Sequence, residues 1–327
     1  MEIATFVSNI QTMNQEKEKQ FLITKLKCND DYEGRVEATL LEKKTHKKSD
    51  KALLYIHGFV DYFFQYEMAD WANQLGFNFY AIDLRKYGRS ILQHQKPNNF
   101  KNYREYFEEL DMAIDFIRNK RGNDKLVLMG HSTGGLIASL YAHHRSGEKT
   151  IDAIILNSPF FDFNMPSAVK TLVLPLIAAL GRLFPDLPSP AGLKKGYAES
   201  LHKDYKGEWD FDLSLKPIAG FQLNLGWINA IYLAQKELQK GLDIQVPVLL
   251  LHASKSVSPG NYNPEMHTAD SVLDVKDISR YAKSLGKNIE VVVVKEGMHD
   301  LILSTKKVRD KVYLVMQEFL QKLNLLT

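Results

Sequence analysis

The sequence predicts an α/β fold, with a mostly parallel central sheet covered by helices on both faces and an inserted helical cap. Three observations carry this prediction. Short, wholly apolar runs alternate with stretches of helical periodicity, as buried parallel strands and their crossover helices require. One apolar run ends in a sharp, glycine-rich turn with a serine at its apex. Residues 158–245 interrupt the alternation, because they contain no clear strand and are broken by repeated prolines.

The first elements are predicted to be strands. Residues 21–27 and 35–41 alternate apolar and polar side chains, or nearly so, which is typical of a hairpin that leads into a sheet. Residues 52–56 and 77–83 are almost entirely apolar and predict buried parallel strands. A helical pattern through Trp71 and Leu75 separates these two strands.

The later elements continue the alternation. Apolar residues recur at steps of four and three from Tyr103 to Ile117, which marks an amphipathic helix. Further strands are expected at residues 151–157, 246–252 and 289–294. A last helix carries one apolar face from Val308 to Leu323. The expected organisation is a core of residues 1–157 and 246–327, divided by an inserted helical cap, residues 158–245, hereafter the cap segment.

Residues 126–135 read Leu-Val-Leu-Met-Gly-His-Ser-Thr-Gly-Gly, and a helix-compatible run follows them. This is a strand, a turn and a helix around a G-x-S-x-G pattern, the context of a nucleophile elbow. The glycines avoid a clash across the turn, and the helix N-terminus favours negative charge beside it. The pattern alone can occur by chance, but its setting makes Ser132 the candidate nucleophile.

A serine nucleophile needs a base, and a histidine is the side chain whose pKa suits this role. His299 follows the last predicted strand, at the carboxyl edge of the sheet, where such a base is expected. The acid that orients it is expected after the strand at 246–252, and Asp270 is the first aspartate there. Asp274, Asp277 and Asp162 remain alternatives, because only chain order places the acid.

Two backbone N–H groups are expected to stabilise the oxyanion. One is that of Thr133, directly after the nucleophile, and the other is that of Phe59, in the loop after the first parallel strand. Gly58 lets that loop approach closely. The side chains of His57, His131, His252 and His267 are expected to be structural.

Together, residues 130–135 (Gly-His-Ser-Thr-Gly-Gly), the His57-Gly58 loop and residues 83–90 (Asp-Leu-Arg-Lys-Tyr-Gly-Arg-Ser) resemble the α/β-hydrolase superfamily. More narrowly, they resemble its monoacylglycerol lipase and lysophospholipase branch, often labelled serine aminopeptidase-like. The stretch around Asp270 is similar to the acid motif of that branch, and the stretch around His299 to its histidine motif. The resemblance implies an α/β-hydrolase fold and hydrolysis of a carboxylic ester through an acyl-enzyme. The long loop before Asp270 and the proline-rich cap segment depart from the pattern.

Composition sets further expectations. The net charge of +3 over 327 residues does not indicate nucleic-acid binding. No His/Cys cluster has zinc-like spacing, and the expected chemistry needs no metal or organic cofactor. Cys28, the single cysteine, suits a reducing cytoplasm, and residues 1–10 lack the pattern of a secretory signal. The longest uncharged apolar run, residues 171–181, is too short for stable membrane insertion. The sequence favours neither a monomer nor a dimer.

The expected partner is a small ester, lipid-like in the branch that the chain resembles. Its acyl pocket is predicted to include Tyr62, Phe63, Leu176 and Ile177, although ordinary packing explains each of these side chains as well. An aminopeptidase using the same triad is the first alternative, with Glu199, Asp204 or Glu208 of the cap segment as the site for a substrate amine. A non-catalytic binding protein of the same fold is the second alternative.

Overall fold

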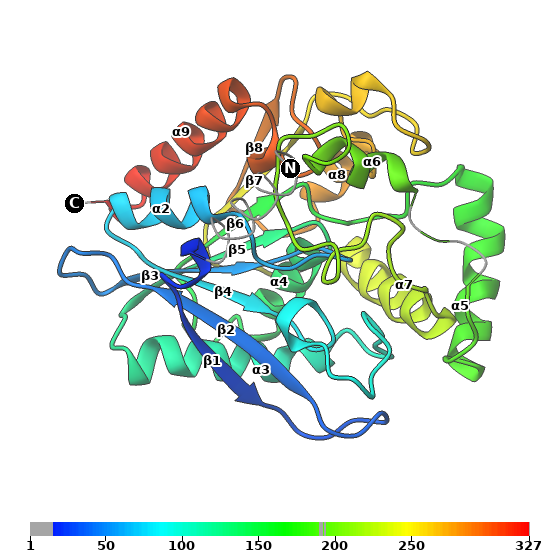
Figure 1. Cartoon of the computed structure of the whole chain (residues 1–327), viewed down its shortest axis with the longest axis horizontal. Coiled ribbons are helices and arrows are strands. Elements are labelled where there is room, and N and C mark those ends of the chain that lie inside the picture. Colours follow the sequence, from blue (N-terminus) through cyan, green and yellow to red (C-terminus); the bar gives the residue numbers. More distant parts are fainter. Residues whose placement is uncertain (1–15, 190–191, 193, 327) are drawn as a thin grey trace, which may run out of the picture.

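The computed structural model describes residues 16–189, 192 and 194–326 (Figure 1). The expectation for residues 1–10 lies outside the described residues. No helix among the described residues is both long enough and apolar enough to cross a membrane.

An eight-stranded sheet forms the centre of the molecule, with the strand order β1-β2-β4-β3-β5-β6-β7-β8. The neighbours from β4 to β8 run parallel, whereas β2 is antiparallel to both β1 and β4. The strands are β1 (Leu22–Lys27), β2 (Glu37–Lys43), β3 (Lys51–Ile56), β4 (Asn78–Asp83), β5 (Lys125–His131), β6 (Ala153–Asn157), β7 (Val248–Ala253) and β8 (Ile289–Val294).

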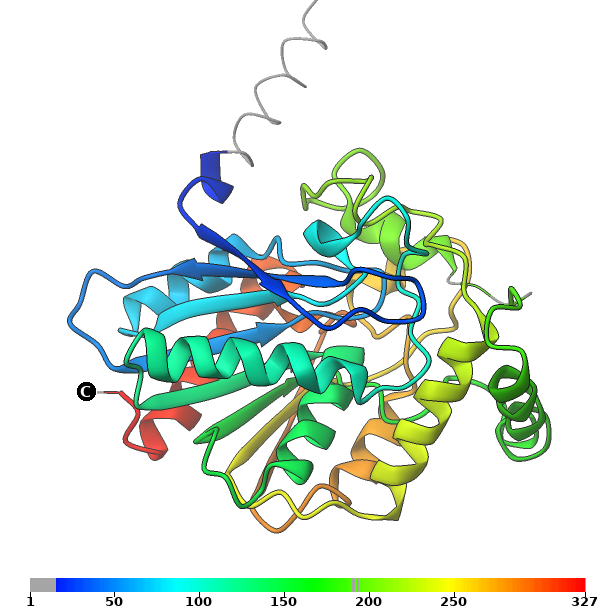
Figure 2. The same ribbon diagram turned by 90° about the horizontal axis from the view of Figure 1, so that it is seen from below.

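Helices cover both faces of this sheet (Figures 1 and 2). They are α2 (Tyr66–Gln74), α3 (Glu105–Asp115), α4 (Thr133–His144), α5 (Leu174–Leu183), α6 (Lys195–Leu201), α7 (Leu225–Lys240), α8 (Val275–Ala282) and α9 (Lys306–Lys322). Apolar side chains of α2 and α9 pack in one buried cluster with one face of the sheet. Those of α3, α4 and α7 pack in a second cluster with the other face.

The period of the strands explains the two cores. In β3, Leu53 and Tyr55 belong to the cluster with α2 and α9, whereas Leu54 and Ile56 belong to the cluster with α3 and α4. Successive strand residues point to opposite faces, so a strand buried on both sides must be apolar throughout. This requirement is why the predicted strands were continuous apolar runs, and the mostly parallel sheet with helices on both faces confirms the predicted fold class.

Every predicted strand lies within about two residues of an observed one. Helix α8 was not predicted, because it has only eight residues and three of them are buried, which is too short a segment for a clear apolar period. Between β6 and β7 lie α5, α6 and α7, and α7 packs on the sheet core through side chains such as Ile231 and Leu238. Helix α5 rests against α7, where a Cβ atom on Gly181 would lie 2.1 Å from the carbonyl oxygen of Leu225. The boundaries of the cap segment stay a prediction.

Candidate active site

Ser132 lies at the turn between β5 and α4, at the carboxyl edge of the sheet. Its backbone has φ 51° and ψ −115°, a strained conformation for a residue with a side chain. A Cβ atom on Gly130 would lie 2.5 Å from the carbonyl oxygen of Gly134, so the tight turn requires glycine there. This sharp turn takes Ser132 out of the line of β5 and places it beside the loop that follows β3.

A chain of hydrogen bonds connects the three predicted catalytic residues. The Oγ of Ser132 lies 3.0 Å from Nε2 of His299, and Nδ1 of the same ring lies 2.9 Å from Oδ2 of Asp270. The other carboxylate oxygen of Asp270 accepts hydrogen bonds from the backbone N–H groups of Val272 and Leu273, at 2.8 and 2.7 Å. The Asp270 carboxylate is therefore fixed by its own loop, and as an acceptor it favours the ring tautomer with Nδ1 as donor and Nε2 as acceptor.

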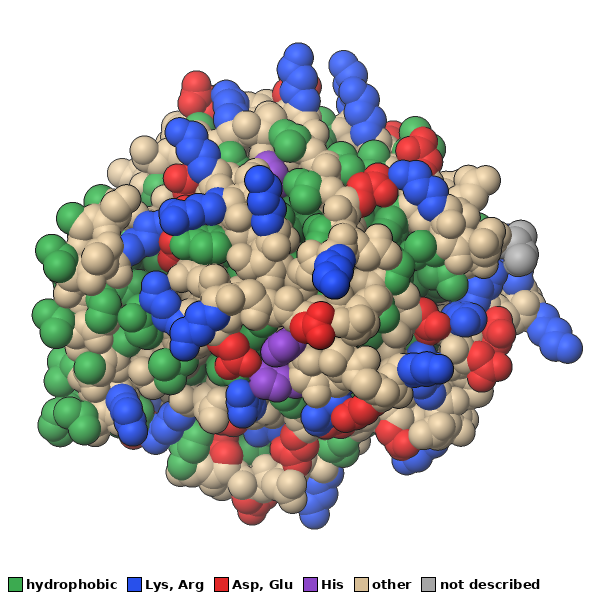
Figure 3. All heavy atoms as spheres, turned by 180° about the vertical axis from the view of Figure 1, so that it is seen from behind, with side chains coloured by type: hydrophobic (Ala, Val, Ile, Leu, Met, Phe, Trp, Pro, Cys, Tyr) green, Lys and Arg blue, Asp and Glu red, His purple; other side chains and the backbone are tan. Residues whose placement is uncertain are grey.

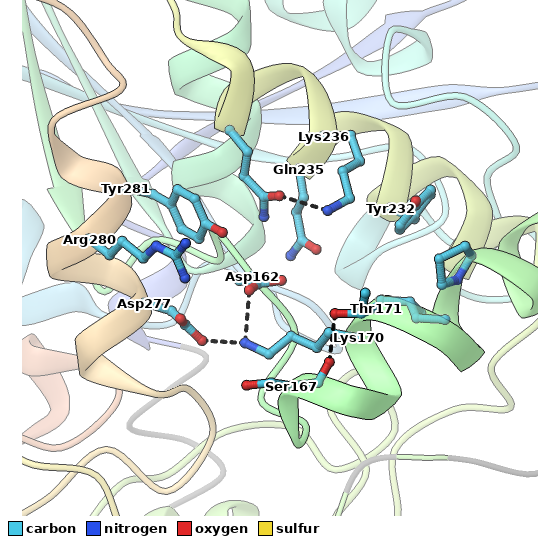
Figure 4. A pocket seen from close by; sticks show the side chains of 13 residues that line it. Asp162, Ser167, Lys170, Thr171, Tyr232, Gln235, Lys236, Asp277, Arg280 and Tyr281 are labelled. Atoms are coloured by element: carbon cyan, nitrogen blue, oxygen red, sulfur yellow. Dashed lines mark hydrogen bonds and ion pairs between the residues drawn. The ribbon is translucent and has the colours of Figure 1, made fainter.

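The alternative acids have other partners. Asp274 caps the N-terminus of α8, where its side chain accepts a hydrogen bond from the N–H of Lys276 at 2.9 Å. Asp162 and Asp277 both bind the ammonium group of Lys170, at 2.8 and 2.5 Å (Figure 4). None of these three carboxylates has a described contact with His299, and Asp270 does.

The loop after β3 passes directly beside Ser132. A Cβ atom on Gly58 would lie 3.2 Å from the Cβ atom of Ser132. The His57 ring holds the start of the loop, because its Nε2 accepts the N–H of Leu84 at 3.0 Å and its Nδ1 contacts the carbonyl oxygen of Gly58 at 2.7 Å. Burial lowers the pKa of His57 in spite of the nearby Asp83 and Asp61. The loop therefore carries a neutral, structural histidine and brings the Phe59 backbone close to the site.

Among the described residues, Asp61, His131 and Asp300 are one group of side chains close enough to share a metal ion, with ligand atoms within 4.8 Å of one another. Each already has a protein partner. Asp61 binds Lys216, Nδ1 of His131 contacts the carbonyl oxygen of Asn157 at 3.1 Å, and Asp300 accepts a hydrogen bond from the Asn157 side chain at 2.7 Å. This arrangement holds the loops around the nucleophile without requiring an ion.

A cavity of about 220 Å³ opens in front of Ser132 and His299. Its walls are mainly apolar and include Phe59, Phe160, Phe163, Leu223 and Trp227. The rings of Phe59 and Trp227 pack with centroids 4.4 Å apart. Such a cavity can hold an apolar chain next to Ser132. This lining could not be predicted, because its residues come from separate loops and α7 and share no periodic pattern.

The side chains predicted to line the acyl pocket are not among the described residues that line this cavity. Tyr62 packs in a small buried cluster with Phe64 and Phe211, and Phe63 belongs to the core between the sheet, α2 and α9. Neither is among the residues that line the cavity. Both follow the predicted oxyanion loop in sequence, but the chain turns into the interior before it reaches them.

Leu176 and Ile177 are also absent from the cavity lining. Ile177 is half-buried against the core, and the side chain of Leu176 is 71% exposed on the outer face of α5. The apolar side chains along the left edge of Figure 3 lie where α5 forms the surface of the molecule. Helix α5 approaches α7 closely at Gly181, and its exposed leucines, Leu176 among them, face outward.

Three polar side chains of the cap segment line the cavity, Asn164, Tyr197 and Lys216, and no sequence pattern predicts any of them. Tyr197 on α6 packs edge to face on the ring of His299, and Lys216 forms an ion pair with Asp61. Glu199, Asp204 and Glu208, which an aminopeptidase would use to bind an amine, are not among the described residues that line the cavity.

A family model described as serine aminopeptidase, S33, matches residues 47–306. The probable lysophospholipase L2 of Haemophilus influenzae is 24% identical over 264 residues, which cover 75% of each chain. The monoacylglycerol lipase of Mycolicibacterium smegmatis is 25% identical over 201 residues, which cover 61% of this chain and 68% of that one.

Solved structures show the same fold. A soluble variant of monoglyceride lipase from Saccharomyces cerevisiae superposes with a TM-score of 0.69 at 18% identity, covering 91% of this chain and 94% of that one. The monoacylglycerol lipase of Paleococcus ferrophilus gives a TM-score of 0.64 at 20% identity, covering 87% and 99%. The chain therefore belongs to the serine aminopeptidase S33 family of α/β-hydrolases, within the branch that resembles monoacylglycerol lipases and lysophospholipases.

Proposed function

We propose that this protein is a serine hydrolase that cleaves carboxylic esters through an acyl-enzyme, with Ser132 as nucleophile, His299 as base and Asp270 as the acid that orients it. The observation that carries the proposal is the hydrogen-bonded chain from Asp270 through His299 to Ser132, at the mouth of an apolar cavity. The names of the relatives, a probable lysophospholipase and a monoacylglycerol lipase, support esters as the substrate class.

The geometry supports a defined order of proton transfers. Nε2 of His299 takes the proton of Ser132 as Oγ attacks the ester carbonyl, and the Asp270 carboxylate stabilises the imidazolium that forms. The N–H groups of Phe59 and Thr133 donate hydrogen bonds to the carbonyl oxygen as it becomes negatively charged. His299 then returns the proton to the leaving alcohol. Water, activated by the same ring, releases the acid and restores the serine.

The cavity suits a substrate with an apolar acyl part. Phe160, Phe163 and Trp227 offer it an aromatic wall, and each buried methylene contributes about 0.8 kcal/mol to binding. We propose a lysophospholipid-like or monoacylglycerol-like ester on this basis. A free, buried Cys28 suits a reducing compartment, and the cytoplasm is the proposed location.

Labelling with a fluorophosphonate probe tests the proposal. The wild type should react, and Ser132→Ala should not, because the substitution removes only the attacking oxygen. Ser139→Ala is the matched control, since Ser139 is a buried serine of α4 whose hydroxyl binds the Gly135 carbonyl oxygen instead. Labelling that persists in Ser132→Ala, or fails in the wild type, contradicts the proposal.

Paired substrates separate ester from amide hydrolysis. p-Nitrophenyl butyrate should be turned over and leucine p-nitroanilide should not. Faster cleavage of the anilide would instead indicate the aminopeptidase. A folded wild-type protein with no labelling and no turnover of either compound would indicate a binding protein.

A further inference from the structure

A short stretch of the cap segment, residues 211–216, lies against the loop that follows β3. The two stretches touch at three points. The rings of Phe211 and Phe64 pack with centroids 5.0 Å apart. The N–H of Asp212 donates a hydrogen bond to the hydroxyl of Tyr62 at 2.7 Å. The ammonium group of Lys216 lies 2.6 Å from the carboxylate of Asp61. The cap segment therefore holds the middle of this loop, two residues beyond Phe59.

The ion pair is buried. The Lys216 side chain is 8% exposed and that of Asp61 is 3% exposed, and both line the cavity in front of Ser132. The rings of Phe64 and Phe211 lie 5.1 and 5.4 Å from the Lys216 ammonium. Burial opposes ionisation of Asp61, but the charge and hydrogen bond of Lys216, together with His57 and His131, more than offset it, and the pKa of Asp61 lies below its ordinary value. Loss of either partner would leave the other charge buried and unpaired.

The backbone between Phe59 and Asp61 is strained. Val60 has a φ of 47°, which a β-branched residue rarely adopts. The core fixes the two ends of the loop, since Leu84 binds His57 and the N–H of Phe63 donates to Asp83 at 2.9 Å. Among the described residues, the hydrogen bonds from the core hold the two ends of the loop, and the ion pair with Lys216 holds Asp61 in the middle. A strained conformation persists only where its surroundings impose it.

We infer that Lys216 is a positioning residue for the oxyanion site, which holds the strained loop through Asp61 so that the Phe59 N–H stays directed at the reacting carbonyl oxygen. The inference rests on the proposed function, because it takes Phe59 as an oxyanion donor. Lys216 itself does not touch the reacting atoms in this scheme. Through this ion pair, the geometry of the oxyanion site depends on how the cap segment packs against the loop after β3.

The test compares two ion pairs that tie the cap segment to the core. Lys216→Met breaks the pair at the oxyanion loop. Lys170→Met breaks the ion pair with Asp277 of α8, along with one to Asp162 inside the cap segment (Figure 4), and is the matched control. For p-nitrophenyl butyrate, Lys216→Met should lower kcat about tenfold or more and leave KM within about threefold, because a misplaced donor weakens the transition state rather than the ground state. Lys170→Met should stay within about twofold in kcat.

Three further readouts distinguish positioning from general loosening. Lys216→Arg, which keeps the charge, should recover most of the lost kcat. Affinity for butaneboronic acid, whose tetrahedral adduct places an oxygen in the oxyanion site, should fall in Lys216→Met by about the same factor as kcat/KM. Amide hydrogen exchange at residues 59–62 should rise in Lys216→Met and not in Lys170→Met.

Several results would overturn the inference. They are equal losses of kcat in the two lysine variants, a change in KM alone, or unchanged exchange at residues 59–62. If Lys216→Met does not fold, the double variant Asp61→Asn/Lys216→Met removes the unpaired buried carboxylate as well. This double variant should still show the loss of kcat. Failure of the proposed function looks different, because the wild type would then lack labelling at Ser132 while the exchange experiment still reports on the loop.

Discussion

The ring of Tyr197 meets the imidazole of His299 edge to face, with centroids 5.4 Å apart and planes at 77°. Its hydroxyl accepts a hydrogen bond from the N–H of Asp300, the next residue along the chain, at 3.1 Å. Tyr197 lies on α6, between β6 and β7, and so reaches the proposed base from outside the sheet. The imidazole of His299 therefore has two neighbours that hold it. Asp270 binds its Nδ1, and the Tyr197 ring of the cap segment packs edge to face against it.

Two substitutions separate the contributions of the Tyr197 ring and hydroxyl. Tyr197→Ala should lower kcat about two- to tenfold, since an edge-to-face aromatic pair contributes about 0.5–1.5 kcal/mol. Tyr197→Phe keeps the ring and should retain most of this activity. Steady-state kinetics on p-nitrophenyl butyrate measure both. An equal loss in the two variants would assign the effect to the hydrogen bond with Asp300 instead.

The elements that bear the triad candidates could be predicted because each depends on local signals. Ser132 needed glycines around a strand–turn–helix, and Asp270 and His299 follow apolar strands whose carboxyl ends meet at one edge of a parallel sheet. These are properties of short segments and of chain order. The close contacts among the three side chains agree with the expected geometry, and their catalytic roles stay a prediction until Ser132 and Asp270 are tested.

The substrate cavity and the loop contacts could not be predicted, because they depend on long-range packing. Asp61 and Lys216 are 155 residues apart, and no local pattern couples them. In α5, Leu174 is buried and Leu176 is exposed, although the helix is apolar on both sides. Which side faces inward follows from the close approach of Gly181 to α7, and periodicity cannot reveal this when both faces are apolar.

The acid is tested by a matched pair of substitutions. Asp270→Asn should reduce kcat by a factor on the order of 10⁴, because the amide favours the wrong tautomer of His299. Asp274→Asn should change neither kcat nor the melting temperature appreciably, because asparagine caps a helix about as well as aspartate. Asp274→Ala should lose only stability, about 1 kcal/mol, through the missing cap of α8. A large loss of kcat in the Asp274 variants would make that residue the acid.

Acid should destabilise the fold through its buried histidines. Burial lowers the pKa of His57, His131 and His252 in the folded state below the unfolded value near 6.5. The unfolded chain then binds more protons below that pH. Their contribution to stability is therefore present above about pH 6.5 and is lost as the pH falls, by at most about 1.4 kcal/mol per pH unit for each histidine.

His57→Gln checks this pH dependence, because glutamine can still accept the N–H of Leu84 but does not titrate. The free energy of unfolding in urea should fall between pH 7.5 and pH 5.5 in the wild type, and it should fall less in the variant. An identical fall in the two proteins would mean that His57 does not contribute to the acid sensitivity.

The acyl chain should lie along the aromatic wall of the cavity, and Leu223 offers a direct test. Leu223 is a partly buried residue that lines the cavity, whereas Leu176 is an exposed leucine of α5 that does not. If the acyl chain packs on Leu223, then Leu223→Ser should weaken kcat/KM progressively from acetate to octanoate, because each methylene buried there contributes about 0.8 kcal/mol. Leu176→Ser should leave the same profile unchanged for soluble p-nitrophenyl esters. The melting temperature of each variant controls for lost packing. A flat chain-length profile in Leu223→Ser, or a steep one in Leu176→Ser, would place the acyl chain on a different surface of the protein.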